Sequence, residues 1–113
     1  MIEIYHNPRC GKSREGLQIL EASKKDFKTI KYFDEPLSID ELQHIIALLK
    51  IKPIDLIRQN ETIWKDHFKN KKLSEKKLIE LMVEHPKLME RPIVVNDNKA
   101  IIGRPPFRIL EIL

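Results

Sequence analysis

The segment MIEIYHNPRCGKSREGL, residues 1–17, decides the fold, because it predicts a strand, a tight turn and a helix in quick succession. Residues 2–5 alternate between apolar and polar side chains, as a short strand does. The strand must end at His6-Asn7-Pro8, since proline cannot continue a strand ladder and restricts the residue before it. A helical spacing of apolar side chains begins after Cys10. We therefore expect Cys10 where a strand gives way to a helix N-terminus.

The middle of the chain predicts a strand followed by a block of helices. Residues 29–33 (TIKYF) are β-branched and aromatic, which favours a second strand. About residues 38–88 then read as a helical block. Three helix starts are predicted in it by a capping box, a first-turn proline and a serine cap: Ser38 with Glu41, Pro53 and Ser74.

The end of the chain predicts a hairpin and a last helix. Residues 93–95 and 100–102 are apolar strands around an Asn-Asp-Asn turn, and Pro105 can start the helix. The order β-α-β, helical block, β-β-α is that of an α/β thioredoxin-like (glutaredoxin-like) fold, with a mixed central sheet and a helical insertion. We expect one domain over residues 1–113. Such folds typically place a cis proline opposite the active cysteine, so the fold predicts a cis bond before Pro92. The residues alone favour an ordinary trans proline that opens the strand, since X-Pro bonds are trans by default.

Composition narrows the functional classes. The 113 residues are 42% hydrophobic and 34% charged, as in soluble globular proteins, and no apolar stretch is long enough for a membrane span. A single cysteine needs no oxidising compartment, so we expect a cytoplasmic location. Nothing in the sequence demands a dimer, so a monomer is expected. The net charge is +4, but the lysines of residues 24–31 and 65–77 are expected on solvated faces without aromatic stacking partners. We therefore expect no binding of nucleic acid. We also expect no metal site, because the four histidines lack partners at the spacing of metal ligands.

Cys10 is the residue most open to chemistry. A lone cysteine is commonly a small buried side chain, but this one lies among polar and cationic residues. The free N–H groups and the dipole of a helix N-terminus stabilise a thiolate. The cations His6, Arg9, Lys12 and Arg14 are expected to lower the pKa of Cys10 further. We therefore predict a nucleophilic thiolate.

The position three residues after Cys10 holds Ser13 rather than a second cysteine. This C-x-x-S pattern cannot close an internal disulfide, so an adduct on Cys10 must be released by an external thiol such as glutathione. Ser13 can donate a hydrogen bond to the thiolate or satisfy N–H groups of the first helical turn. Phosphatases with a nucleophilic cysteine hold their anion in a single loop with the spacing C-x5-R, but the residue six positions after Cys10 is Gly16. An oxyanion substrate would therefore need distant arginines, for which the candidates are Arg58, Arg91 and Arg104.

Residues 5–14 (YHNPRCGKSR) closely resemble the active-site motif of the glutaredoxin-dependent arsenate reductases, the ArsC family. Later blocks resemble that family in the same order: residues 56–60, 85–86, 91–95 and 103–105. The resemblance implies that Cys10 attacks arsenate and that glutathione and glutaredoxin resolve the adduct to arsenite. It also implies that His6 lowers the pKa of Cys10, that Ser13 assists, and that the arginines Arg14, Arg58, Arg91 and Arg104 bind the oxyanion. Glutathione would be a co-substrate, with no bound cofactor.

Two other functions remain open. Residues 35–41 and the His85-Pro86 and Arg91-Pro92 blocks also resemble Spx-type regulators, which share the fold and bind RNA polymerase. Those regulators typically carry a C-x-x-C switch, so Ser13 and Arg58 favour the reductase. The other alternative is a glutathione-linked oxidoreductase that acts on a different substrate through the same cysteine.

Overall fold

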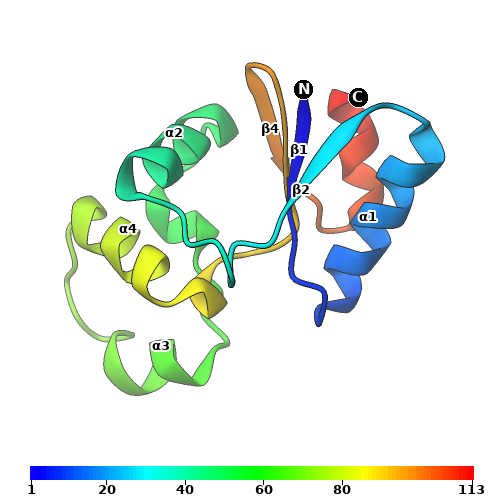
Figure 1. Ribbon diagram of the computed structural model, residues 1–113. Helices are drawn as coiled ribbons and strands as arrows, with labels where there is room; N and C mark the ends of the chain where they lie inside the picture. Colours follow the sequence, from blue (N-terminus) through cyan, green and yellow to red (C-terminus); the bar gives the residue numbers. More distant parts are fainter. The chain divides into compact units, whose positions relative to one another are not determined.

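The computed structural model describes residues 1–113, which form two compact units (Figure 1). The first unit contains residues 1–35 and 91–113, and the second contains residues 36–90. The chain thus leaves the first unit once and returns to it.

A four-stranded mixed sheet forms the first unit. Its strand order is β2-β1-β3-β4, with β1 parallel to β2 and antiparallel to β3, and with β3 antiparallel to β4. The strands, and the helix α1 that connects the first two, have these bounds: β1 Ile2–Tyr5, α1 Gly11–Ser23, β2 Phe27–Ile30, β3 Ile93–Asn96 and β4 Lys99–Ile102. Together with a last helix, they confirm the predicted thioredoxin-like order β-α-β and β-β-α.

The second strand lies earlier than predicted, at Phe27–Ile30 instead of residues 29–33. Its partner β1 sets this limit, because Tyr5 pairs with Ile30 and β1 then turns away at the Asn-Pro sequence. The carbonyl of Lys31 accepts the backbone N–H groups of Asp34 and Glu35 instead, which makes a turn. Tyr32 and Phe33 favour a strand, but β1 offers them no pairing partner beyond Tyr5, so β2 ends at Ile30.

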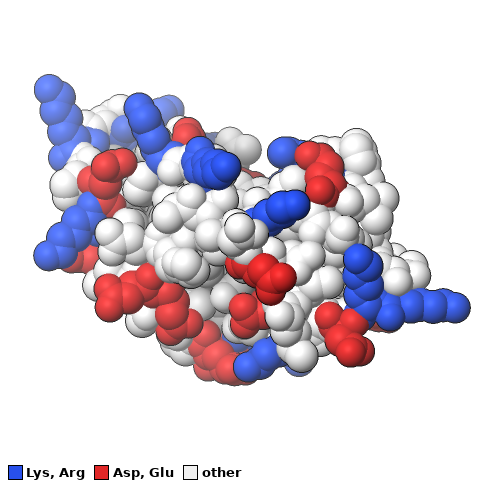
Figure 2. Space-filling model, turned by 90° about the horizontal axis from the view of Figure 1, so that it is seen from above, with Lys and Arg blue, Asp and Glu red and all other residues white.

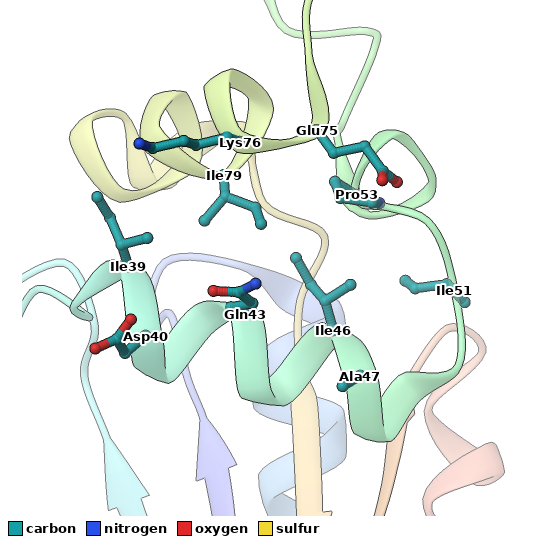
Figure 3. Close-up of a pocket in the computed structure, with 10 residues that line it drawn as sticks. All are labelled: Ile39, Asp40, Gln43, Ile46, Ala47, Ile51, Pro53, Glu75, Lys76 and Ile79. Atoms are coloured by element: carbon teal, nitrogen blue, oxygen red, sulfur yellow. The ribbon is translucent and has the colours of Figure 1, made fainter.

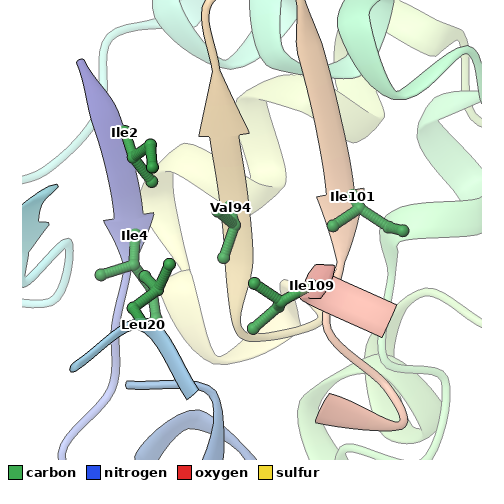
Figure 4. Close-up of a cluster of buried hydrophobic side chains, with 6 residues drawn as sticks. All are labelled: Ile2, Ile4, Leu20, Val94, Ile101 and Ile109. Carbon is green, nitrogen blue, oxygen red and sulfur yellow. The ribbon is translucent and has the colours of Figure 1, made fainter. Parts of the chain in front are cut away.

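Alternate residues of the strands build the core of the first unit. Ile4 pairs with Val94, and Val94 pairs with Ile101, so their side chains form a row across the sheet. Leu20 of α1 and Ile109 of the last helix pack against this row (Figure 4). Burial of each such side chain stabilises the fold by about 1.5–3 kcal/mol.

The last helix is a 3₁₀ helix, η3, at Pro106–Ile112. It begins one residue later than predicted. Pro105 is extended, with ψ 156°, because the following Pro106 disfavours a helical conformation before it. Figure 1 shows η3 beside α1 on one face of the sheet.

The second unit is helical. The capping box at Ser38 is confirmed: its Oγ accepts the N–H of Glu41 at 3.0 Å, and the Glu41 carboxylate accepts the N–H of Ser38 at 3.3 Å. The Ser74 cap is confirmed as well, because its Oγ accepts the N–H of Lys77 at 3.1 Å. The helices are α2 Ile39–Leu49, η1 Pro53–Leu56, α3 Thr62–His67, α4 Glu75–Glu84 and η2 Pro86–Leu88.

Two details of the second unit differ from the sequence prediction. The sequence predicts a short helix from Pro53 through Arg58, but the helix ends at Leu56 because Ile57 is extended and bridges to Met89. The short helix α3 was not predicted, since six residues are too few to show a helical period.

Charges of both signs are interspersed on the face of the molecule seen in Figure 2. No helix combines the length and the apolar character that a membrane span requires.

Candidate active site

The pairing of the strands brings three segments to one edge of the sheet. Tyr5, Ile93 and Ile102 pair in a row across β1, β3 and β4. The loop after Tyr5 leads to Cys10, residue 92 precedes Ile93, and residue 103 follows Ile102. The cysteine loop, the Arg91-Pro92 pair and the Gly103-Arg104 pair therefore leave the sheet at the same edge.

Cys10 is the N-cap of α1 and is half-buried. The loop before it is held by hydrogen bonds within itself. The N–H of Cys10 donates to the carbonyl of Asn7 at 3.0 Å, and the N–H of Arg9 donates to Oδ1 of Asn7 at 3.1 Å. The helix then starts with a bond from the N–H of Arg14 to the carbonyl of Cys10. The thiol thus stands at the end of α1 where backbone N–H groups are free.

The pKa of Cys10 lies below the ordinary value of 9.0. Burial raises this pKa, but hydrogen bonds to the sulfur outweigh burial. They come, in order of effect, from the backbone of Ser13, the side chain of Arg91 and the backbone of Lys12, and the charge of Arg91 adds to them. This lowering increases the fraction of Cys10 that is present as thiolate, the reactive form of a cysteine.

The groups that lower the pKa of Cys10 are not the neighbouring cations that the sequence suggested. The pKa of Cys10 is not lowered by the side chains of the four neighbouring residues named in the sequence analysis, His6, Arg9, Lys12 and Arg14. Lys12 is engaged elsewhere, with its Nζ 3.7 Å from the Glu15 carboxylate. The predicted contribution of the helix N-terminus is confirmed, whereas the main cation is Arg91, which lies 81 positions further along the chain.

Ser13 connects the cysteine loop to His6. Its Oγ lies 2.7 Å from Nδ1 of His6 and accepts the N–H of Asn7 at 2.9 Å. A hydroxyl both donates and accepts, so one group can serve both partners. Ser13 is fully buried, and His6 is 4% exposed. The hydroxyl of Ser13 thus fixes the loop and the imidazole, while its backbone N–H acts on the sulfur.

Burial lowers the pKa of His6 from its ordinary value of 6.5, and the charges of Lys31 and Arg14 lower it as well. A hydrogen bond with the Ser13 backbone acts in the opposite direction without reversing the shift. His6 is therefore neutral at neutral pH. A neutral imidazole orients its neighbours by hydrogen bonding and adds no positive charge to the site.

Arg91 and Arg104 lie side by side. Nη1 of Arg104 donates to the carbonyl of Arg91 at 3.2 Å, and the Arg91-Pro92 bond is cis, as predicted. The Arg104-Pro105 bond is cis too, which the sequence analysis did not predict. The guanidinium of Arg104 is thus held at the backbone of Arg91, and the guanidinium of Arg91 acts on the Cys10 thiol.

Two glycines allow Pro92 to pack closely beneath this site. A Cβ on Gly16 would lie 2.8 Å from Cγ of Pro92 and 2.9 Å from Cδ1 of Ile109. A Cβ on Gly103 would lie 2.9 Å from the same Pro92 atom. Only glycine fits at these two positions without a shift of the proline that follows Arg91.

The two remaining predicted arginines have other contacts. Arg14 is exposed, and its Nη1 donates to the carbonyl of Pro8 at 3.0 Å, which braces the cysteine loop. Arg58 belongs to the second unit, where its backbone N–H donates to the carbonyl of Leu88 at 2.7 Å and its Nε lies 3.6 Å from Glu61. Their part in binding a substrate stays a prediction.

Two residues of the site were missed by the sequence analysis. Asn7 was recognised only as part of a turn, yet it is buried and accepts two N–H groups of the loop. Lys31 influences His6 because the N–H of His6 donates to the carbonyl of Ile30, the residue before Lys31. Only the register of the parallel strands could have revealed this neighbour. No group of three or more metal-ligating side chains is present.

Known proteins that are similar in sequence or in structure match almost the entire chain. The uncharacterized protein YfgD of Escherichia coli is 43% identical, and the match covers 99% of this chain and 96% of that protein. The arsenate reductase of Haemophilus influenzae is 43% identical, with 97% of each chain covered. The solved structure of arsenate reductase from Vibrio cholerae superimposes with a TM-score of 0.94 at 41% identity, covering 99% of this chain and 97% of that one. Residues 5–112 match the ArsC family, and the protein therefore belongs to the ArsC family.

Proposed function

We propose that the protein is an arsenate reductase in which the Cys10 thiolate attacks arsenate and external thiols supply the electrons. The observation that carries the proposal is the Cys10 thiol itself, whose pKa is lowered by the N–H groups of α1 and by Arg91. The relatives named arsenate reductase cover almost the entire chain, which supports arsenate as the substrate.

In the first step, Sγ of Cys10 forms a bond to arsenic while one arsenate oxygen leaves as water. Arsenic remains in its +5 state, so this step needs a nucleophile and no reductant. Arg91 and Arg104 pair with the oxygens, since a guanidinium matches an oxyanion with two parallel N–H groups. Because the pKa of Cys10 is lowered, a larger fraction of the thiol is in the nucleophilic thiolate form at a given pH.

In the next steps, two external thiols reduce the adduct. Glutathione replaces a second oxygen on arsenic, which also leaves as water. The thiolate of glutaredoxin then attacks the glutathione sulfur, and the electron pair of the broken S–As bond reduces arsenic to the +3 state. Water finally cleaves the bond to Cys10 and releases arsenite. The net reaction converts arsenate and two thiols into arsenite, one disulfide and one water.

The requirement for external thiols follows from the single cysteine. Ser13 stands where a resolving cysteine would be needed, so Cys10 has no partner for an internal disulfide. Glutathione serves as co-substrate, with no bound cofactor. We place the reaction in the cytoplasm, where such thiols are kept reduced.

The test is an assay of arsenite formation with the purified protein, arsenate, glutathione and glutaredoxin. Full turnover is expected only in the complete mixture. Omission of glutaredoxin or of glutathione should each reduce the rate to that of the mixture without protein. If the complete mixture forms no arsenite above that rate, arsenate is not the substrate. If turnover persists without glutathione, the proposed route of the electrons is wrong.

A further inference from the structure

A basic pocket lies in the second unit and belongs to no step of the proposed reaction. Four lysines and one glutamate line it, together with Gln59 and an apolar wall. We call this set the lysine pocket: Lys52, Pro53, Ile54, Gln59, Trp64, Lys69, Lys71, Lys72, Leu73, Glu75 and Leu78. Its volume is about 700 Å³. This value lies within the range of about 300–1,000 Å³ that is usual for small-molecule sites.

The loop after α3 places three of the lysines. The N–H of Lys69 donates to the carbonyl of Trp64 at 2.9 Å, and the N–H of Lys71 donates to the carbonyl of Phe68 at 3.1 Å. These bonds fold the loop back onto the end of α3. The Phe68 ring packs against Trp64, with centroids 6.2 Å apart, and Nζ of Lys71 lies 5.8 Å from its centre. These contacts hold the backbone of the loop that carries Lys69, Lys71 and Lys72.

The four ammonium groups are not neutralised by the protein. None of the ammonium groups of Lys52, Lys69, Lys71 and Lys72 forms a salt bridge within 4.0 Å, although such bridges form elsewhere in the chain. The Asp55 carboxylate accepts the backbone N–H of Lys52 at 3.1 Å. Glu75 is the one acid of the lining, so three positive charges remain in excess. Positive charge gathered around a concave surface attracts anions more strongly than the same charge spread over a convex one.

A second groove adjoins the lysine pocket, since both are lined by Pro53 and Glu75, and its lining combines apolar side chains with Asp40, Gln43, Glu75 and Lys76. Its volume is about 490 Å³. Figure 3 shows Ile39 and Ile46 of α2 and Ile79 of α4 pointing into the space between the two helices. A ligand seated among the lysines therefore has an apolar surface next to its charged end.

We propose that the lysine pocket is a binding site for an organic polyanion, a small molecule with several phosphate groups joined to a less polar body. The phosphates would lie among the lysines, and the body would lie against the wall of Pro53, Ile54 and Leu73. Each lysine acts as a point charge with rotatable donors, which suits phosphate groups of variable geometry. This site uses none of the residues of the proposed reduction.

The experiment measures binding of ATP, without added metal, to the full-length protein by calorimetry and by the fluorescence of Trp64. Trp64 is the single tryptophan of the chain and lines the pocket, so its signal reports on this site. We expect saturable binding with a stoichiometry of one. Inorganic tripolyphosphate should bind more weakly, because it has no organic body to contact the apolar wall.

Two triple variants separate the pocket from the net charge. The variant K69Q/K71Q/K72Q should bind ATP at least about tenfold more weakly, since each exposed charge contact contributes up to about a fivefold effect. The control K25Q/K28Q/K99Q removes the same charge from exposed sites in the first unit, and its affinity should stay within about twofold of the wild type.

Three results would overturn the proposal: no saturable ATP binding by the wild type, equal weakening in both triple variants, or tripolyphosphate that binds as tightly as ATP. All six substituted lysines are exposed, so both variants are expected to fold. Their thermal unfolding is measured beside the wild type. Arsenite formation by the pocket variant should equal that of the control, which separates this site from the proposed reductase function.

Discussion

The hydroxyl oxygen of Ser13 lies 2.7 Å from Nδ1 of His6, and both residues are buried. Because the same oxygen accepts the N–H of Asn7, one hydroxyl holds the imidazole and the cysteine loop together. The hydrogen bonds of this buried group are worth more to stability than those of an exposed serine.

Ser13→Ala removes the hydroxyl and leaves the Asn7 N–H without its acceptor. We expect the free energy of unfolding to fall by about 1–3 kcal/mol, the cost of an unsatisfied buried polar group. Urea denaturation measures this loss. The matched control is Ser23→Ala, whose Oγ donates to the carbonyl of Leu20 in a more open setting and should matter less. An equal loss in both variants would contradict the role given to Ser13.

The lowered pKa of His6 predicts a loss of stability in acid. Since the folded pKa lies below the ordinary 6.5, the unfolded chain binds more protons between these two values. The contribution of His6 is therefore complete above about pH 6.5 and is lost as the pH falls through the folded pKa. His6→Asn should make the pH dependence of the unfolding free energy shallower in this range.

The control for this pH dependence is His44→Asn, because His44 is exposed. The His44 variant should keep the wild-type acid slope, as measured by urea denaturation at a series of pH values. A wild-type slope in the His6 variant would show that His6 is not the group that titrates.

Arg91→Gln removes a hydrogen bond to Cys10 and a positive charge beside it. The pKa of Cys10 should rise, and the pH profile of alkylation by iodoacetamide should move upward with it. In the wild type the thiolate forms above its lowered pKa, so alkylation slows as the pH falls through a value below 9.0. We expect kcat/KM for arsenate to fall at least about tenfold, as for a charge-assisted hydrogen bond of about 1.5–3 kcal/mol.

Arg108→Gln is the control for that change, because Arg108 is exposed and pairs only with Glu111 at 3.4 Å. It should leave the alkylation profile where it is in the wild type. An unchanged profile in the Arg91 variant would mean that Arg91 does not act on the thiol.

Gly16→Ala tests the packing beneath Arg91. The new Cβ would meet Pro92 at 2.8 Å, and such overpacking costs about 1–3 kcal/mol. The gain in helix propensity of about 1 kcal/mol offsets part of this cost. Gly11→Ala is the matched control in the same helix, since its nearest atom would lie 3.7 Å away and the change should be neutral or stabilising. If both variants have the same unfolding free energy, the contact with Pro92 is not restrictive.

The sequence predicted the elements that carry strong local signals. The Ser38 capping box, the Ser74 cap and the break at Asn7-Pro8 depend on residues within one turn of each other, so no tertiary contact was needed. The end of β2 and the first residue of η3 could not be predicted in this way. The end of β2 depends on the length of its partner strand β1. The first residue of η3 depends on which of the two consecutive prolines, Pro105 or Pro106, begins the helix.

For the site, the sequence identified Cys10 and its helix N-terminus, whereas the source of the positive charge required the fold. Local cations stand next to Cys10 in the sequence, but Lys12 pairs with Glu15 and Arg14 donates to the carbonyl of Pro8. Arg91 reaches the sulfur because β3 pairs with β1 in one particular register. The pairing register of two strands that are far apart in the sequence cannot be read from local sequence patterns.

The most direct test of the central claim is the rate of arsenite formation by the wild type and by Cys10→Ser, with arsenate, glutathione and glutaredoxin supplied to both. A hydroxyl of almost the same size replaces the thiol, so the fold should persist, as thermal unfolding can verify. The account predicts turnover by the wild type and a rate for the serine variant equal to that without protein. Turnover by Cys10→Ser would contradict the assignment of Cys10 as the nucleophile.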